Sequence, residues 1–377
     1  MKYYTKPEGS YISFMSNKVK SYGGINLAQG IPGFNPPSEL LDILSNIAHQ
    51  SIHQYAPGDG NHDLLERLVE RFDPVFDKQD FLITNGATEA VSLLYTYLNR
   101  LLAKPYSAIA FEPVYESYSQ LPRIFNDRFV SFPLSEKGAV DFPQFRETCI
   151  RENTRIVFLN TPGNPFGKVW TREEVSTLIE IAEELDMYVI VDAVYQPLYF
   201  GEEPFDPAST VNKQVFYVNS FSKIFSITGW RIGYLIASQD HMPGIKSVHD
   251  YTGLCVPSVL QQALAEFIRD YNWGAAYVKT LRERLKKSYD RMHQGLSALG
   301  FDIPDIEGGF FIWARLPESW EDGFQFAMNL YDQQKVAVIP GEHFSPSARN
   351  YVRFNIARGI DEIEEAIIRM KRFFSGE

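Results

Sequence analysis

The sequence predicts an α/β protein with a mostly parallel sheet covered by helices on both faces, together with a smaller α+β domain. The first observation is that short apolar segments alternate with helical patterns through the middle of the chain. The second is that these segments are apolar at nearly every position, which is typical of strands covered on both faces. The third is that strands separated by helices pair in parallel, since each helix returns the chain to the starting edge.

The elements of the larger domain follow one another along the chain. Phe81–Thr84 predicts a strand, and Thr88–Leu102 predicts the helix after it. Thr171 with Glu174 forms a capping-box pattern, which predicts a helix from Thr171 to about Asp186. The other predicted strands are Ala108–Phe111, Arg155–Asn160, Met187–Val191, Val215–Val218 and Tyr234–Ala237.

The C-terminal part of the chain has a different pattern. A long helical pattern from Pro257 to Met292 is followed by short strand-like segments and by a helix from about Asp361 to Phe373. The predicted strands are Gly309–Trp313, Val336–Ile339 and Tyr351–Ile356. We therefore expect residues 1–45 to be an N-terminal arm that joins the small domain, 46–275 to be the large domain, and 276–377 to be the small C-terminal domain.

The composition limits the class of protein. The chain has 377 residues, of which 45% are hydrophobic and 22% charged, as in a globular protein of about two domains. Its net charge of -11 disfavours a nucleic-acid surface. Cys149 and Cys255 form neither a disulfide framework nor a metal cluster, and the histidines offer no clear ligand set. With neither a signal peptide nor a membrane-spanning run evident, we expect a cytoplasmic protein without metal, nucleic-acid or membrane partners.

One segment combines an amine with a nearby cation and several small residues. It is Ser220–Gly233, with the sequence SFSKIFSITGWRIG. Lys223 can hold an aldehyde covalently, while Arg231 and the hydroxyl of Ser220 can hold a phosphate. Taken alone, the segment is also what an ordinary surface loop with one lysine contains. The surrounding sequence favours the first interpretation.

Candidate ligand-binding residues stand at or just after the carboxyl ends of four predicted strands, where open α/β sheets bind ligands. They are Gly86, Ala87 and Thr88, then Asn160 and Asn164, then Asp192 and Tyr195, and finally Ser220 and Lys223. The free N–H groups at the helix start after Gly86 suit a phosphate. Asp192 suits a protonated ring nitrogen, although a turn or cap aspartate has the same pattern. Tyr195 and Asn164 suit a phenolic oxygen, although, taken alone, such a tyrosine is more often a core residue and such an asparagine more often a turn residue.

Two further residues suit the same ligand set. Tyr115 can stack on an aromatic ring, and a buried structural tyrosine is the alternative. Arg353, within a predicted strand of the small domain, can grip a carboxylate through two parallel hydrogen bonds, and an exposed strand arginine is the alternative.

These motifs, in this order and spacing, resemble the class I/II aminotransferases of fold type I, which use pyridoxal 5′-phosphate. The resemblance extends over nearly the whole chain and implies a sheet of the seven-stranded type. The matching segments are Asn26–Phe34, Gln54–Pro57, Asn85–Ala90, Glu112–Tyr118, Asn160–Pro165, Asp192–Tyr195, Ser220–Gly233 and Tyr351–Phe354.

The resemblance also implies a role for each residue. Lys223 corresponds to the Schiff-base lysine, Asp192 to the partner of the pyridine nitrogen, and Asn164 and Tyr195 to the pair at the phenolic oxygen. The implied phosphate ligands are Gly86, Ala87, Thr88, Ser220 and Arg231, with Tyr55 contributed by the second subunit of a homodimer. Tyr115 corresponds to the stacking aromatic residue. Gly30, Asn164 and Arg353 correspond to the substrate site. Tyr11, Ile12 and Phe14 either line the side-chain pocket or pack in the dimer.

The implied activity is transfer of an amino group from an L-amino acid to a 2-oxo acid by a ping-pong mechanism. The Gln29–Phe34 segment and Val248–Tyr251 look most like the methionine, glutamine and kynurenine aminotransferases. Aromatic amino acids are further expected amino donors. A second arginine for a side-chain carboxylate is not evident, which disfavours aspartate. A carbon–sulfur β-lyase on the same scaffold is the first alternative, and a cofactor-binding regulatory protein is the second.

Overall fold

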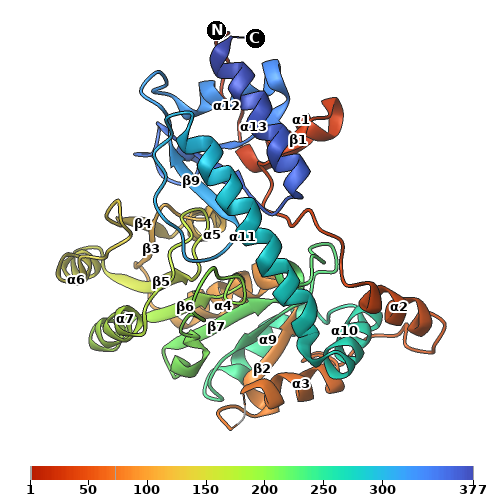
Figure 1. The fold of residues 1–377 in the computed structure, drawn as a ribbon. Coiled ribbons are helices and arrows are strands. Elements are labelled where there is room, and N and C mark those ends of the chain that lie inside the picture. Colours follow the sequence, from red (N-terminus) through yellow and green to blue (C-terminus); the bar gives the residue numbers. More distant parts are fainter. Residues whose placement is uncertain (1, 73, 377) are drawn as a thin grey trace.

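The structure is a computed structural model, and it describes residues 2–72 and 74–376. Figure 1 shows a larger lower part built on a wide sheet and a smaller upper part built on short strands. The long helix α11 (Ala275–Ser297) runs from one part to the other, and both chain ends lie at the top of the smaller part. This arrangement confirms the predicted α/β fold with its additional small unit.

Among the described residues the larger sheet has seven strands in the order β2-β8-β7-β6-β5-β3-β4. Their bounds are β2 Phe81–Thr84, β3 Ser107–Glu112, β4 Arg128–Pro133, β5 Thr154–Asn160, β6 Tyr188–Asp192, β7 Val215–Ser220 and β8 Gly233–Ile236. The pairs from β7 to β4 are parallel, and β8 is antiparallel to both β2 and β7. Strand β4 was not predicted, because most side chains of this edge strand are exposed or half-buried and form no apolar run.

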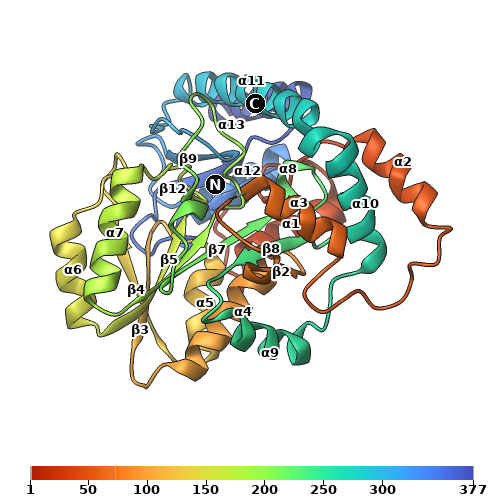
Figure 2. The same ribbon diagram turned by 90° about the horizontal axis from the view of Figure 1, so that it is seen from below.

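Helices cover both faces of this sheet, as Figure 2 shows from below. Side chains alternate between the two faces: Leu82 and Ile190 pack with the helices of one face, and Ile83 and Val189 with those of the other. The first face carries α4 (Ala87–Leu101), α5 (Glu116–Ile124) and α9 (Met242–Thr252). The second carries α2 (Ser38–Ile47), α3 (His62–Phe72), α6 (Phe142–Arg151), α7 (Arg172–Glu184) and α10 (Ser258–Asp270).

The predicted capping box at the start of α7 is confirmed. The Thr171 hydroxyl accepts from the Glu174 N–H at 3.2 Å, and the Glu174 carboxylate accepts from the Thr171 N–H at 3.0 Å. Two helix-start N–H groups are therefore satisfied by one reciprocal pair.

The smaller part contains two short sheets. Strands β11 (Ile339–Pro340), β12 (Tyr351–Asn355) and β9 (Phe311–Arg315) are antiparallel, while β1 (Ile25–Asn26) pairs in parallel with β10 (Val336–Ala337). The single strand predicted over 336–339 is therefore wrong, since the chain changes sheet there. All four residues are fully buried, so their pattern holds no information about which sheet each joins. The helices of this part are α1 (Tyr11–Tyr22), α12 (Gly323–Gln334) and α13 (Ile360–Ser375).

The predicted long helical pattern from 257 to 292 is divided into two helices. Asn272, Trp273 and Gly274 all have positive φ, and this left-handed turn separates α10 from α11. Val278 near the start of α11 packs in the core of the larger part, whereas Leu285 packs in the core of the smaller part. The short elements not yet named are η1 Lys78–Asp80, η2 Pro207–Thr210, α8 Phe221–Ile224, η3 Asn272–Gly274 and η4 Gly341–His343.

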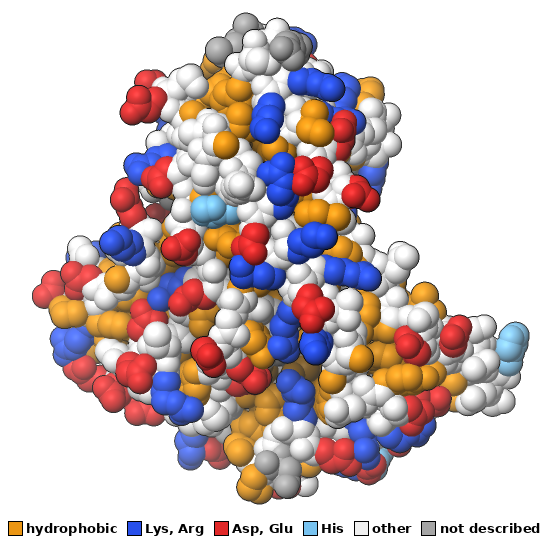
Figure 3. Space-filling view, viewed as in Figure 1, with side chains coloured by type: hydrophobic (Ala, Val, Ile, Leu, Met, Phe, Trp, Pro, Cys, Tyr) orange, Lys and Arg blue, Asp and Glu red, His pale blue; other side chains and the backbone are white. Residues whose placement is uncertain are grey.

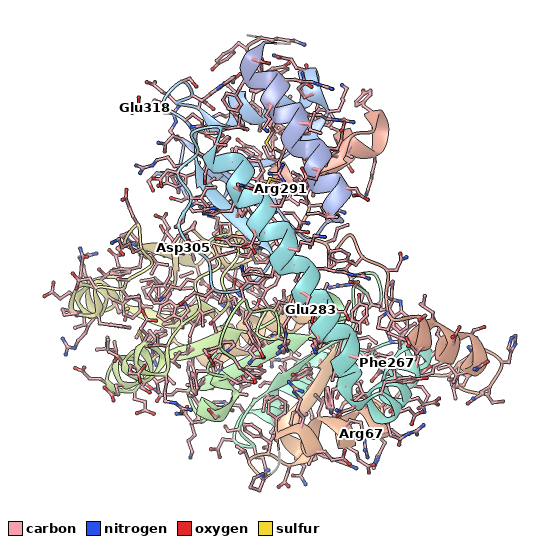
Figure 4. All side chains as sticks on the ribbon, in the orientation of Figure 1. Arg67, Phe267, Glu283, Arg291, Asp305 and Glu318 are labelled. Atoms are coloured by element: carbon pink, nitrogen blue, oxygen red, sulfur yellow. The ribbon has the colours of Figure 1, made fainter. Side chains whose placement is uncertain are left out.

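The upper end of α11 is fixed to the smaller part by an ion pair. The Arg291 guanidinium of α11 donates to the Glu364 carboxylate of α13 at 2.5 and 2.7 Å. Figure 4 labels Arg291 beside α13 and Glu283 lower on the same helix. Through this pair and its packing in both hydrophobic cores, a single helix connects the two parts.

Packing also bears on where the two parts divide. Leu40 and Ile47 of α2 lie in the core of the larger part, whereas Ile25 and Leu27 lie in that of the smaller part. The predicted boundaries at 45 and 275 stay a prediction. We propose from the packing that the large domain extends from Ser38 to Val278.

The described residues provide no sign of a membrane segment or a metal centre. Over 2–72 and 74–376, no helix has the length and apolar character needed to cross a membrane, and no group of three or more His, Cys, Asp or Glu is placed to hold a metal ion. In Figure 3 acidic and basic side chains are interspersed over both parts of the molecule.

Candidate active site

A cavity of about 440 Å³ lies beyond the carboxyl ends of β5, β6 and β7 and is walled by both parts of the molecule. Its wall includes eleven of the predicted residues, which are Gly30, Ala87, Thr88, Tyr115, Asn164, Asp192, Tyr195, Ser220, Lys223, Arg231 and Arg353. Segments distant in sequence thus meet at one edge of the sheet, as expected for an open α/β fold.

Lys223 lies on α8, the single helical turn that follows β7. The Ser220 hydroxyl caps this turn by accepting from the Ser222 N–H at 3.1 Å. The Lys223 amine donates to the Gly30 carbonyl at 2.7 Å. Burial, together with the cations Arg231 and Arg353, lowers the pKa of Lys223 to about 8, although the negative charge of Asp192 opposes the decrease. Near neutral pH a much larger fraction of this amine than of an ordinary lysine is therefore uncharged and nucleophilic.

Asp192 ends β6 with its side chain buried. Its Oδ2 accepts from the Tyr118 hydroxyl at 2.7 Å, and its Oδ1 accepts from the Val194 N–H at 3.2 Å. Burial raises the pKa of Asp192, while these two hydrogen bonds and the charge of Lys223 oppose the increase. The result is a fixed carboxylate facing a cavity that also holds an amine.

The start of α4 forms a cup beside Arg231. The first N–H groups of the helix have no partner within it, so they point at whatever occupies the cup. Gly86 has φ 79°, and a Cβ built there would lie 2.5 Å from Arg231 Nη2, so glycine is required. Arg231 itself is held by the carbonyls of Thr228 at 3.0 Å and Asn85 at 3.1 Å.

A partly buried network next to this cup, joining Asn85, Glu89 and His249, was not predicted. The Glu89 carboxylate accepts from both the backbone and the side chain of Asn85. His249 Nε2 lies 3.8 Å from Glu89, and its ring is fully buried. The sequence showed Glu89 only as part of a motif, because its partner His249 is 160 residues away.

Arg353 is fully buried on β12. It donates to the Asn164 amide oxygen at 2.9 Å and to the Ala28 carbonyl. Its guanidinium carbon lies over the rings of Phe311 and Phe344, 4.3 and 4.8 Å from the ring centres. Within the described part of the chain its Nε has no hydrogen-bond partner. Burial lowers the pKa of Arg353 to about 10, so the group stays charged at neutral pH. A buried cation with a free N–H suits a carboxylate ligand.

The aromatic residues occupy three different environments. Tyr195 is buried edge-on against Phe310 and Phe311, and burial raises its pKa. Tyr115 lines the cavity and meets the Tyr118 ring edge-on at 5.4 Å. Tyr55 is 84% exposed and does not line the cavity of this chain.

Of the three arm residues, only Ile12 lines the cavity. Tyr11 instead donates to Glu342 at 3.1 Å and stacks on His343, and Phe14 packs against the core of the smaller part. These contacts explain the arm's position on the smaller part of the same chain.

The model of the family described as aminotransferase class I and II matches residues 22–369. The chain belongs to this family. The family's enzymes act on amino acids and 2-oxo acids with pyridoxal 5′-phosphate, so the predicted enzyme class and cofactor are confirmed.

Similar proteins differ in the substrates that their names give. The chain is 27% identical to the probable aspartate aminotransferase of Methanocaldococcus jannaschii over 93% of each chain. It matches the structure of N-succinyldiaminopimelate aminotransferase from Mycobacterium tuberculosis with a TM-score of 0.88 and 28% identity, over 96% of this chain and 97% of that one. It also matches YbdL of Escherichia coli, identified as having a methionine aminotransferase function, with a TM-score of 0.87 and 26% identity over 98% and 100%.

The residues of this aminotransferase fit pyridoxal 5′-phosphate. Lys223 would provide a low-pKa amine for its aldehyde, and Asp192 would provide a buried carboxylate for its ring nitrogen. The cup at Gly86 with Arg231 provides cationic and N–H partners for a phosphate. These three groups share one cavity, as a single ligand with three such functions requires.

Proposed function

We propose that this aminotransferase takes its amino group from an L-amino acid with an uncharged side chain, such as methionine, glutamine, kynurenine or an aromatic amino acid. A 2-oxo acid accepts the group in the second half of a ping-pong cycle. The supporting observation is that the cavity lining also includes apolar and neutral polar side chains. Among them are Ile12, Val91, Leu121, Ile124, Ser117 and Gln120.

The cations of the cavity are already assigned to other groups. Among the described residues that line it, the Lys and Arg side chains are Lys223, Arg231 and Arg353. We assign Arg231 to the cofactor phosphate and Arg353 to the substrate α-carboxylate. Neither is left for a side-chain carboxylate, which disfavours aspartate as donor.

Each side chain then has a defined task. Bound pyridoxal 5′-phosphate supplies an electron-withdrawing ring that weakens the bond between the substrate α-carbon and its hydrogen. Asp192 holds the proton on the ring nitrogen, and Tyr195 and Asn164 hydrogen-bond the phenolic oxygen. Lys223 accepts the α-proton at Nζ and donates it again, which requires the uncharged amine that its lowered pKa provides. Tyr115 packs on the ring, and Gly30 with Arg353 orients the substrate.

We also propose a homodimer to which Tyr55 contributes across the interface. Tyr55 is 84% exposed, and Tyr251, 91% exposed, and Leu254, 50% exposed, add further apolar surface. Gly58 approaches the Leu254 carbonyl, so the two segments adjoin. A second subunit would cover this surface. The cytoplasmic location stays a prediction from composition.

The substrate proposal is tested by the visible absorption spectrum of the holoenzyme. Methionine, glutamine, kynurenine, phenylalanine and aspartate are added singly, and a 2-oxo acid is added afterwards. We expect an uncharged donor to bleach the band of the bound cofactor and the oxo acid to restore it, with aspartate ineffective at equal concentration. Bleaching by aspartate alone contradicts the proposed donor class. Formation of pyruvate and ammonia from cystathionine without an oxo acid supports the β-lyase alternative instead.

Arg353→Lys tests the assignment of the α-carboxylate. The variant keeps the charge but loses the planar pair of N–H donors, so kcat/KM for the amino acid is expected to fall about 10- to 100-fold, chiefly through KM. The control is an amine donor without a carboxylate, whose slow reaction with the bound cofactor should change less than about twofold. Equal losses for both donors would show that Arg353 acts on something other than the carboxylate.

A further inference from the structure

Tyr118 is a buried residue that lines the cavity and has no role in the mechanism proposed so far. It lies on α5, and its hydroxyl donates to Asp192 Oδ2 at 2.7 Å. Within the described residues the other donor to this carboxylate is the Val194 N–H, which lies 3.2 Å from Oδ1. Tyr118 is thus the side chain that holds Asp192, through the shorter of the two hydrogen bonds.

The Tyr118 ring is fixed on two sides. It stacks on Phe158 with ring centres 5.1 Å apart and planes 11° from parallel. It meets Tyr115 edge-on at 5.4 Å and 79°. A phenol held in this way has little freedom to leave the carboxylate, so its hydrogen bond has a fixed direction.

We propose that Tyr118 is a positioning residue of the aminotransferase reaction, which orients the Asp192 carboxylate and keeps it ionised for the ring nitrogen of pyridoxal 5′-phosphate. This inference rests on the role proposed above for Asp192. An O–H donor stabilises the charged form of a carboxylate. Without it, a carboxylate buried in this site becomes more basic and competes for the proton of the ring nitrogen.

The other titratable groups around Asp192 act in defined directions. Lys223 on α8 favours the ionised carboxylate. Burial and, to a smaller extent, the negative charge of Asp192 raise the pKa of Tyr195, which lies on the turn after β6 and stays neutral. Tyr118, on α5, is the neutral donor among these neighbours, since burial raises its pKa well above the usual value. Removing its hydroxyl therefore changes the basicity of Asp192 without removing a charge.

The test compares Tyr118→Phe with Tyr95→Phe. Tyr95 is a matched control, because it is also buried and also stacks on Phe158, with ring centres 6.0 Å apart. It also donates to a carboxylate, that of Asp127, at 2.8 Å, and the Asp127 side chain is 2% exposed. Tyr95 does not line the cavity. Each substitution removes one hydroxyl, so a purely structural effect should appear in both variants.

The readout is the pH midpoint of the visible band of the bound cofactor, together with the cofactor dissociation constant and steady-state kinetics. We expect Tyr118→Phe to raise the midpoint by about one pH unit. A cofactor ring that withdraws fewer electrons leaves the Lys223 nitrogen that holds the cofactor more basic. We expect kcat to fall about tenfold with KM within about twofold. Tyr95→Phe should leave the midpoint and kcat unchanged.

A second variant keeps the test decisive if Tyr118→Phe does not fold. Site-specific 3-fluorotyrosine at position 118 has a more acidic hydroxyl and is a stronger donor, so the midpoint should move down. An unshifted midpoint in a folded, cofactor-loaded variant overturns the role of Tyr118 alone. A wild-type protein that shows no cofactor band overturns both this inference and the proposed function.

Discussion

Lys223→Ala is expected to lower turnover by at least about 10⁴-fold while the fold is retained. Among the described residues lining the cavity, Lys223 is the one lysine, so no other amine there can take over its covalent and proton-transfer tasks. Steady-state assay with the donor found by the spectral screen measures the loss. Lys223→Arg is the matched variant, because it keeps a positive charge but offers no uncharged amine. We expect it to be equally inactive, and substantial activity in either variant would contradict the assignment.

The same residue also predicts how cofactor capture depends on pH. With a pKa of about 8, roughly a tenth of the Lys223 amine is uncharged at pH 7, against less than about 0.1% for an ordinary lysine. Capture of pyridoxal 5′-phosphate by the apo-protein should therefore accelerate with rising pH up to about 8 and then level off. Borohydride reduction followed by mass spectrometry should find the cofactor on Lys223. Efficient labelling of another lysine in Lys223→Ala would sink the interpretation.

Asp192→Asn is expected to reduce kcat about 10²- to 10³-fold. The amide cannot balance a protonated ring nitrogen, so the bound cofactor would withdraw fewer electrons. The variant should stay folded, because it removes a buried charge and the Tyr118 hydroxyl can still donate to the amide oxygen. Loss of the negative charge should also lower the Lys223 pKa further, since Asp192 opposes its decrease.

The control for this variant is the cofactor dissociation constant, measured by titrating the apo-protein. A loss of kcat much larger than the loss of cofactor occupancy is expected if Asp192 acts on the ring. Full activity at full occupancy would remove Asp192 from the mechanism. Asp192→Glu, which keeps the charge but displaces it, should fall between the wild type and Asp192→Asn.

The fold could be predicted where burial produces a clear sequence pattern. The strands covered on both faces are apolar runs. The two capping residues at the start of α7, Thr171 and Glu174, are only three residues apart in the sequence. Edge strand β4 lacks an apolar run because solvent reaches most of its side chains. The break after α10 depends on the left-handed backbone of Asn272 and Trp273, a conformation that few non-glycine residues adopt and that tryptophan does not signal.

The site could be predicted where residues stand at strand ends, because the ends of parallel strands meet at one edge of the sheet. Tyr118 has a usable signal, since it follows Tyr115 by three residues and so lies on the same side of the first turn of α5. Glu89 and His249 have none, because their contact depends on how α4 packs against α9. The role of Tyr55 depends on a second chain and stays a prediction.

The contacts that close the cavity join parts of the chain that are synthesised far apart in time. Arg353 binds the Ala28 carbonyl across 325 residues, and Lys223 binds the Gly30 carbonyl across 193. During translation the segment at 28–30 therefore has to wait until β12 has left the ribosome before its final partners exist. Loop closure of this length is slow, so the site is among the last features to form. Under the role proposed for Arg353, a chain shortened before β12 would thus be unable to bind the substrate carboxylate.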